Sequence, residues 1–138
     1  MILLDTNVVS ETMRTAEGTV VSWIDKQPVE TLFLSAVTVA ELRLGVAVMP
    51  ASKRRDRLRE DLERRLLPLF HGRVLPFDLA ASQAFAELMA RARAAGLAIG
   101  RADGYIAAVA AANGFAVATR DTGPFKAAGL TVIDPWAA

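Results

Sequence analysis

Four acidic residues are the first candidates for chemistry in this chain: Asp5, Glu41, Asp103 and Asp121. Asp5 ends the apolar run "ILL" and Asp121 follows the strand-like run "FAVATR", whereas Glu41 and Asp103 lie in the first turns of segments with helical periodicity. If the four positions converge, their carboxylates repel one another unless cations neutralise them. Mg²⁺ and Mn²⁺ prefer carboxylate oxygens and bridge to phosphate oxygens, so the pattern predicts a metal-dependent phosphotransferase or nuclease site.

Each acid also has a structural interpretation. Asp5 can cap a following helix, and Thr38 with Glu41 has the spacing of a capping box. Asp103 can interact favourably with the dipole of the apolar helix that it opens, and the "TGP" after Asp121 is typical of a turn. The functional interpretation therefore depends on the four acids meeting in space.

Alternating strand and helix signals predict how the acids are positioned. Strands are expected at 2–4, 31–35, 73–77, 115–120 and 130–135, and helices at 8–14, 18–27, 38–49, 52–67, 79–96 and 103–114. Strands separated by helices indicate βαβ units, an α/β fold and a mainly parallel central sheet flanked by helices. Functional groups gather at the carboxyl ends of such strands, which is where Asp5 and Asp121 are expected.

Composition sets the class of protein. The 138 residues, 53% of them hydrophobic, suit a single domain over 1–138, and a net charge of +1 gives no bulk attraction to nucleic acid. The chain has no cysteine and one histidine, so thiolate and multi-histidine metal sites are excluded. No secretory signal is visible, and the most apolar window, 33–49, contains Glu41 and Arg43, so we expect a cytoplasmic protein without a membrane span.

Short motifs along the whole chain resemble the PIN-domain ribonucleases, in particular the VapC/FitB-like toxins of toxin–antitoxin modules. They are "MILLDTNVVSE", "FLSAVTVAELRLG", "RVLPFD", "ADGYIAA", "ATRDTGPF" and "VIDPW". The resemblance implies a PIN-like fold and an endoribonuclease that hydrolyses RNA phosphodiester bonds with a water activated by Mg²⁺ or Mn²⁺, leaving 5′-phosphate and 3′-hydroxyl ends.

The resemblance also implies roles for individual residues. Asp5, Glu41 and Asp103 match the three acidic positions typical of the family, and Asp121 matches a fourth that many relatives fill with Asn. All four are expected to be catalytic and to hold the metal. Supporting positions that orient the acids or touch phosphate are matched by Thr6, Asn7 and Thr119.

A protein partner follows from the same resemblance. Such toxins are silenced by a small antitoxin and commonly form homodimers. We expect the antitoxin in a groove lined by residues 10–14 and by the apolar stripe of Leu58, Leu62 and Leu66. The alternative is that this stripe simply packs on the sheet.

Basic and aromatic residues are candidates for RNA contacts. The basic run within 53–65 is interspersed with acids, which favours a solvated, ion-paired helix face over an RNA-binding one. For phosphate contacts near Asp103 we expect Arg91, Arg93 and Arg101. For base stacking the candidate is Tyr105, because Trp23 and Trp136 are expected to pack at the sheet periphery.

Two other functions compete with the nuclease. An aspartate-nucleophile phosphatase also begins with an acid after an apolar strand, but it needs a second acid two residues on, where this chain has Asn7. A catalytically inert PIN-like domain that binds RNA or protein would be favoured if the acids failed to bind metal.

Overall fold

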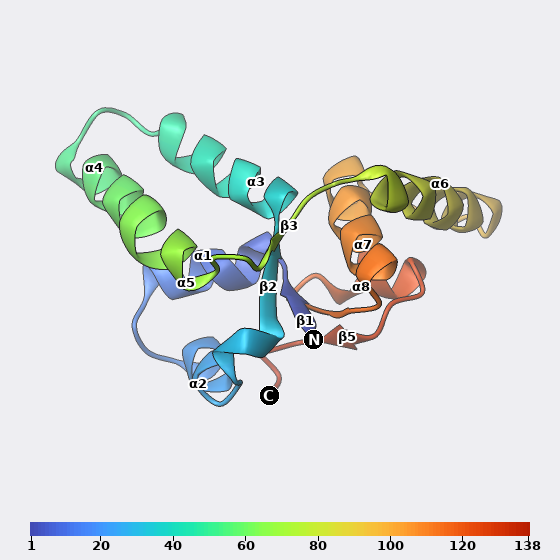
Figure 1. The fold of residues 1–138 in the computed structure, drawn as a ribbon, viewed down its shortest axis with the longest axis horizontal. Helices are drawn as coiled ribbons and strands as arrows, with labels where there is room; N and C mark the ends of the chain where they lie inside the picture. Colours follow the sequence, from blue (N-terminus) through green and yellow to red (C-terminus); the bar gives the residue numbers. More distant parts are fainter.

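One five-stranded sheet forms the centre of the molecule in a computed structural model that describes residues 1–138 (Figure 1). The strand order is β3-β2-β1-β4-β5, and every neighbouring pair is parallel. This confirms the predicted α/β fold with a parallel sheet. The strands are β1 (Ile2–Leu4), β2 (Leu32–Ser35), β3 (Val74–Leu75), β4 (Ala116–Ala118) and β5 (Val132–Ile133).

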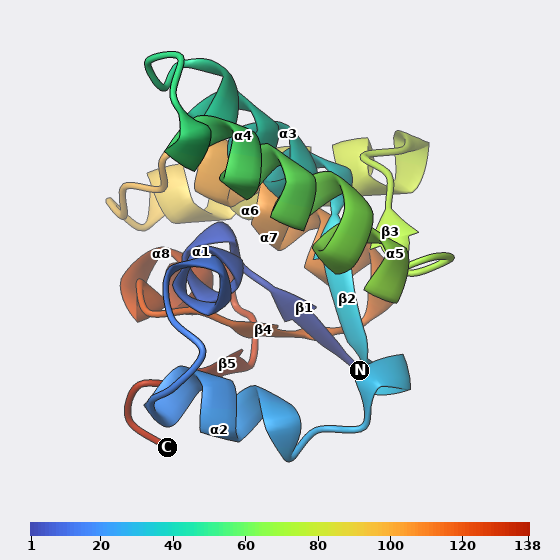
Figure 2. The same ribbon diagram turned by 90° about the vertical axis from the view of Figure 1, so that its left-hand side faces the viewer.

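Helices cover both faces of this sheet. Helices α1 to α5 lie on one side, and α6 to α8 lie on the other (Figures 1 and 2). None of them has the length and apolar character needed to cross a membrane. They are α1 (Thr6–Arg14), α2 (Thr19–Asp25), the 3-10 helix η1 (Val29–Thr31), α3 (Ala36–Ala47), α4 (Lys53–Glu60), the π-helix η2 (Asp61–Leu66), α5 (Leu67–Leu69), α6 (Leu79–Ala94), α7 (Arg101–Asn113) and α8 (Thr122–Ala127).

The sheet separates two hydrophobic clusters. Alternate residues of a strand point to opposite faces, so Leu4 and Ala118 join the cluster under α1, α2 and α3, whereas Leu3 and Val117 join the cluster under α6, α7 and α8. All four residues are buried. Burial on both faces explains why the strands are short continuous apolar runs in the sequence.

Helix α3 begins earlier than the sequence pattern predicts. Its N-cap is Ser35, whose hydroxyl accepts a hydrogen bond from the backbone N–H of Thr38 at 3.0 Å. The predicted capping box of Thr38 and Glu41 is therefore wrong. Glu41 lies in the second turn of α3, so the helix start does not explain a carboxylate there.

The charged segment after Ser52 forms one helical stretch through α4, η2 and α5. Leu62 is buried, and Leu58 and Leu66 pack against the same cluster, so the leucine stripe packs on the core. Pro68 lies within α5, so the helical stretch continues past this proline to Leu69. Of the seven cations in the basic run within 53–65, three are ion-paired, so the predicted ion-paired face is confirmed in part. The pairs are Arg55–Asp56, Arg64–Glu60 and Arg65–Asp61, and Glu63 of the same stretch pairs with Arg43 of α3.

The turn predicted after Asp121 is wrong, because α8 starts there with Asp121 at its N-cap. Proline is tolerated in a first helical turn, where its missing N–H has no partner within the helix, and Pro124 occupies such a position. The helix buries Phe125 in the cluster under α7.

Helices α6 and α7 approach each other closely at the buried Gly104. A Cβ at this position would lie 2.9 Å from the sulfur of Met89 and 3.1 Å from the ring of Phe85, both on α6. Any larger residue at position 104 would therefore require Met89 or Phe85 to move.

Candidate active site

Asp5 lies at the carboxyl end of β1, where the strand order changes direction. The chain continues from β1 to β2 and β3 on one side and then returns to β4 on the other, a place where α/β sheets bind ligands. The Asp5 N–H donates to the carbonyl of Ala118 at 2.9 Å. Its carboxylate accepts from the Thr6 N–H at 2.8 Å and from the Thr119 hydroxyl at 2.7 Å. Asp5 is thus also the N-cap of α1, as its structural interpretation predicted.

The environment of Asp5 opposes its ionisation. The side chain is only 4% exposed, and this burial is the main cause that raises its pKa from 3.8 to about 6. The hydrogen bonds from Thr119 and Thr6 act in the opposite direction, and the charges of Asp103 and Glu41 raise the pKa further. A buried carboxylate whose pKa neighbouring acids raise is a good partner for a cation.

Glu41 reaches the same edge from α3. Its Oε1 atom accepts a hydrogen bond of 2.6 Å from the hydroxyl of Thr6, the first residue of α1. The Thr38 hydroxyl lies 3.2 Å from the same Thr6 oxygen. Thr6 therefore joins α1 to α3 and fixes the position of the Glu41 carboxylate.

Asp103 and Asp121 complete the acidic group from the other layer. Asp103 lies in the first turn of α7, as predicted, and its pKa is raised by burial and then by the charges of Asp121 and Glu41. Asp121 is exposed and lies just after β4. The structure thus brings all four predicted acids to one edge of the sheet, close enough to interact electrostatically.

Thr119 is the centre of the hydrogen bonds at this edge. Its hydroxyl donates to Asp5 and accepts from the side-chain amide of Asn7 at 3.3 Å and from the backbone N–H of Asp121 at 3.0 Å. The Asn7 Oδ1 atom accepts from the backbone N–H of Arg120 at 3.3 Å. The side chains of Thr119 and Asn7 therefore hold the loop after β4 against the start of α1.

An open cleft of about 460 Å³ lies over these groups. Asp121 is not part of its lining, although the preceding residue, Arg120, is. The lining residues are Asp5, Thr6, Asn7, Ser10, Glu11, Arg14, Glu41, Asp103, Arg120 and Trp136.

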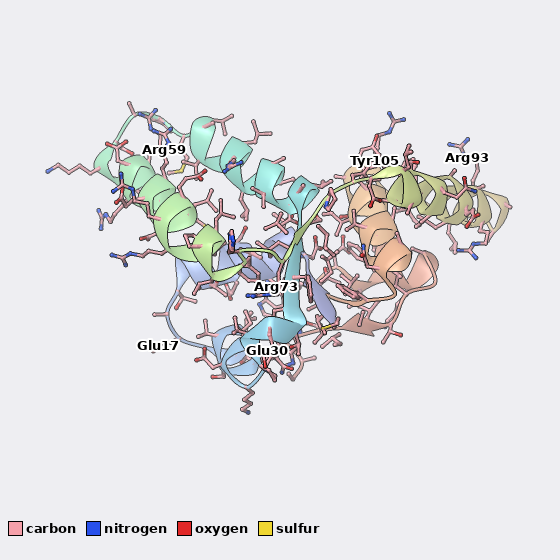
Figure 3. All side chains as sticks on the ribbon, viewed as in Figure 1. Glu17, Glu30, Arg59, Arg73, Arg93 and Tyr105 are labelled. Carbon is pink, nitrogen blue, oxygen red and sulfur yellow. The ribbon has the colours of Figure 1, made fainter.

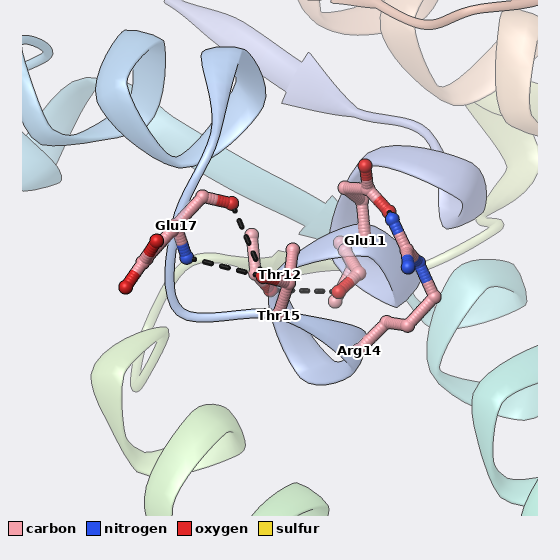
Figure 4. Close-up of polar contacts among 6 residues, drawn as sticks. Glu11, Thr12, Arg14, Thr15 and Glu17 are labelled. Atoms are coloured by element: carbon pink, nitrogen blue, oxygen red, sulfur yellow. Dashed lines mark hydrogen bonds and ion pairs between the residues drawn. The ribbon is translucent and has the colours of Figure 1, made fainter.

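Sequence reasoning missed the two cations of the cleft, Arg14 and Arg120. Arg14 pairs with Glu11 at 2.7 Å on α1 (Figure 4), and Arg120 directly precedes Asp121. The spacing of Glu11 and Arg14 on a helix was the available signal for the first. For Arg120 the signal was its place in the quoted motif "ATRDTGPF".

The residues predicted to contact RNA lie elsewhere. None of Arg91, Arg93 and Arg101 lines the cleft, and Figure 3 shows Arg93 far out on α6. Tyr105 stacks on Phe85, with ring centres 4.7 Å apart, in the packing between α6 and α7. Trp136 packs against the core as predicted, but it also lines the cleft.

The donor chemistry of the cleft suits a hard divalent cation. Its anionic groups are all carboxylates, and the hydroxyl and amide groups around them provide further oxygens. As the side chains are placed, no group of three acidic, histidine or cysteine residues could hold a metal ion by itself. Mg²⁺ keeps several of its waters in proteins, so this set of donors fits a partly hydrated ion.

Fold and site define an α/β protein with an acidic cleft at the point where the strand order reverses. A family model described as "PIN domain" matches residues 2–130. The chain therefore belongs to the PIN-domain family.

Several named proteins are similar to it over their full length. The "Plasmid stability protein StbB" of Pseudomonas syringae pv. tomato is 63% identical over 100% of both chains. The "VapC ribonuclease Y4jK" of Sinorhizobium fredii is 60% identical, covering 99% of this chain and 98% of the relative. The "Toxin FitB" of Neisseria gonorrhoeae is 50% identical over 99% of both.

Solved structures agree with these relatives. FitAcB from Neisseria gonorrhoeae matches with a TM-score of 0.95 at 50% identity over 100% of both chains. VapBC-5 from Mycobacterium tuberculosis, described as a member of the VapBC family of toxin-antitoxin systems, matches with a TM-score of 0.67 at 26% identity, covering 95% of this chain and 94% of that one.

Proposed function

We propose that this protein is a metal-dependent endoribonuclease and the toxin of a toxin–antitoxin pair, acting in the cytoplasm. The observation that carries the proposal is the meeting of Asp5, Glu41, Asp103 and Asp121 at the switch point of a PIN-domain sheet. The names of two similar proteins, a VapC ribonuclease and the toxin FitB, support the activity and the toxin role.

Asp5, Glu41 and Asp103 would hold Mg²⁺ or Mn²⁺, in part through water, with Asp121 outside the lining of the cleft. When bound, such an ion activates water and stabilises the charge that develops on a phosphodiester during hydrolysis. The raised pKa values of Asp5 and Asp103 support this assignment, because a bound cation stabilises the ionised carboxylates that burial and then the neighbouring acids disfavour.

The remaining polar residues keep these acids in position. Thr6 donates to Glu41 and Thr119 donates to Asp5, so each of these hydroxyls orients one carboxylate oxygen. Asn7 holds Thr119 and the backbone of Arg120. An aspartate-nucleophile phosphatase needs a second acid at the position of Asn7, but here Asn7 holds the loop after β4 in place. Hydrolysis of phosphodiesters is therefore favoured over a mechanism with an aspartyl-phosphate intermediate.

The antitoxin is proposed to occupy a second, mostly apolar groove of about 510 Å³ beside the C-terminal half of α1. Met13, Ile24, Leu66 and Phe70 are among the residues that line it. Of the leucine stripe, only Leu66 lines this groove. The antitoxin is therefore proposed to contact α1 and Leu66, but not Leu58 or Leu62. The homodimer stays a prediction.

The test is cleavage of RNA by the purified, partner-free protein with Mg²⁺, with Mn²⁺ and with chelator. We expect metal-dependent cutting that leaves 5′-phosphate and 3′-hydroxyl ends. Asp103→Asn should abolish it, whereas the matched control Asp56→Asn, on the exposed α4, should cut like the wild type. Wild-type protein that neither cuts RNA nor binds Mg²⁺ by calorimetry would instead identify an inert binding domain.

A further inference from the structure

Arg120 and Trp136 form a contact at one side of the acidic cleft. The guanidinium carbon of Arg120 lies over the Trp136 ring, 5.1 Å from its centre, within the range of a cation–π interaction. Both residues line the cleft, and Trp136 is its one aromatic residue. They come from segments that follow β4 and β5, so the two neighbouring strand ends bring them together.

Arg120 keeps its charged group free for a ligand. Its side chain forms no ion pair and no hydrogen bond within the protein, although four carboxylates lie at the same edge. Arg14, the other cation of the cleft, is already paired with Glu11 at 2.7 Å. Arg120 is therefore the available donor for a phosphate in this cleft, and its planar guanidinium suits phosphate oxygens.

Both residues are fixed through their backbones. The N–H of Arg120 donates to Asn7, and the N–H of Trp136 donates to the Asp134 carboxylate at 2.9 Å. Pro135 is buried, and part of Trp136 packs against the core. The contact between the guanidinium and the ring also limits the motion of the two side chains, which lowers the entropy that they lose when a ligand binds.

We propose that Arg120 and Trp136 form a nucleotide-binding subsite for single-stranded RNA beside the acidic group. Arg120 contacts a backbone phosphate, and a base stacks on the surface of the Trp136–Arg120 pair. The subsite rests on the proposed ribonuclease function and deepens it. It selects unpaired RNA, because a base within a duplex is already stacked on its neighbours and does not reach an aromatic ring.

The experiment measures the affinity of a short, fluorescein-labelled single-stranded RNA of mixed sequence by fluorescence anisotropy in chelator, so that RNA is not cut. Arg120→Gln should weaken binding about tenfold and reduce the slope of log Kd against log salt by about 0.7. Trp136→Leu should weaken it about tenfold with an unchanged slope. Arg91→Gln, on α6, is the matched control and should bind like the wild type.

A second readout separates stacking from packing. In a Trp23→Phe background Trp136 is the one tryptophan left, and the RNA should quench its fluorescence. The duplex of the same RNA should quench it much less.

Thermal unfolding of the variants shows whether they remain folded. Wild-type affinity in a folded Arg120→Gln variant, or unquenched Trp136 fluorescence at saturating RNA, overturns the subsite while leaving the nuclease intact. A wild-type chain that neither binds nor cuts RNA overturns the proposed function, and the subsite with it.

Discussion

Asp5→Asn is expected to remove RNA cleavage and, at the same time, to make the metal-free protein more stable at neutral pH. The asparagine has the shape of the buried carboxylate without its charge. It can still accept the N-cap hydrogen bond from the Thr6 N–H. Loss of activity with gain of stability distinguishes a charge kept for function from one that is part of the packing.

The size of the effect follows from the pKa of Asp5. A carboxyl whose pKa rises from 3.8 to about 6 has its ionised form destabilised by about 3 kcal/mol in the fold. Because the folded-state pKa is the higher one, this destabilisation is absent well below pH 3.8, grows between pH 3.8 and about 6, and is complete above about 6. The stability advantage of Asp5→Asn should therefore increase by about 2 kcal/mol between pH of about 4.5 and about 8.

The assay is urea unfolding of wild type and variant in chelator at both pH values. Comparing the two proteins at each pH cancels the titration of all groups that they share. Added Mg²⁺ should stabilise the wild type much more than Asp5→Asn, because a ligand that binds only the folded chain shifts the unfolding equilibrium. A variant that is less stable than the wild type at the higher pH, or a difference that does not change with pH, would refute the reasoning.

Two further substitutions test the hydrogen bonds and the helix packing. Thr119→Val removes the hydroxyl that lowers the pKa of Asp5, so the acidic limb of the pH–rate profile should move to higher pH, and an unmoved limb would contradict this role. Gly104→Ala places a methyl group against the side chains of α6, so it should destabilise the fold by about 1–3 kcal/mol in urea unfolding; a stability equal to wild type would show that α6 moves aside freely.

The sheet and the acidic edge were predictable because they depend on local patterns. Strands buried on both faces are continuous apolar runs, and the residues after Leu4 and Ala118 must come to the same edge of a parallel sheet. Asp5 and Asp121 could be placed in this way, and the family resemblance added the matching of Glu41 and Asp103. The topology of the sheet brings the four acids to one edge, so short sequence motifs were enough to predict where they meet.

Other features depend on competition between neighbours or on contacts between distant segments. Ser35 and Thr38 could both cap α3, and the structure uses Ser35. The pairing of Arg120 with Trp136 joins positions with no shared periodicity, so nothing local marks it. Tyr105 follows Asp103 by two residues, which turns its side chain about 200° around α7. It stacks there on Phe85 of α6.

Three of the predicted metal-binding acids line the cleft, and they come from three different layers. Asp5 belongs to the sheet, Glu41 to α3 on one face and Asp103 to α7 on the other. The distance between the outer two acids is therefore set by the thickness of both hydrophobic clusters, and buried side chains such as Leu42 and Ile106 act as spacers for groups that they never touch. A change in the volume of either core residue should consequently alter the separation of Glu41 and Asp103.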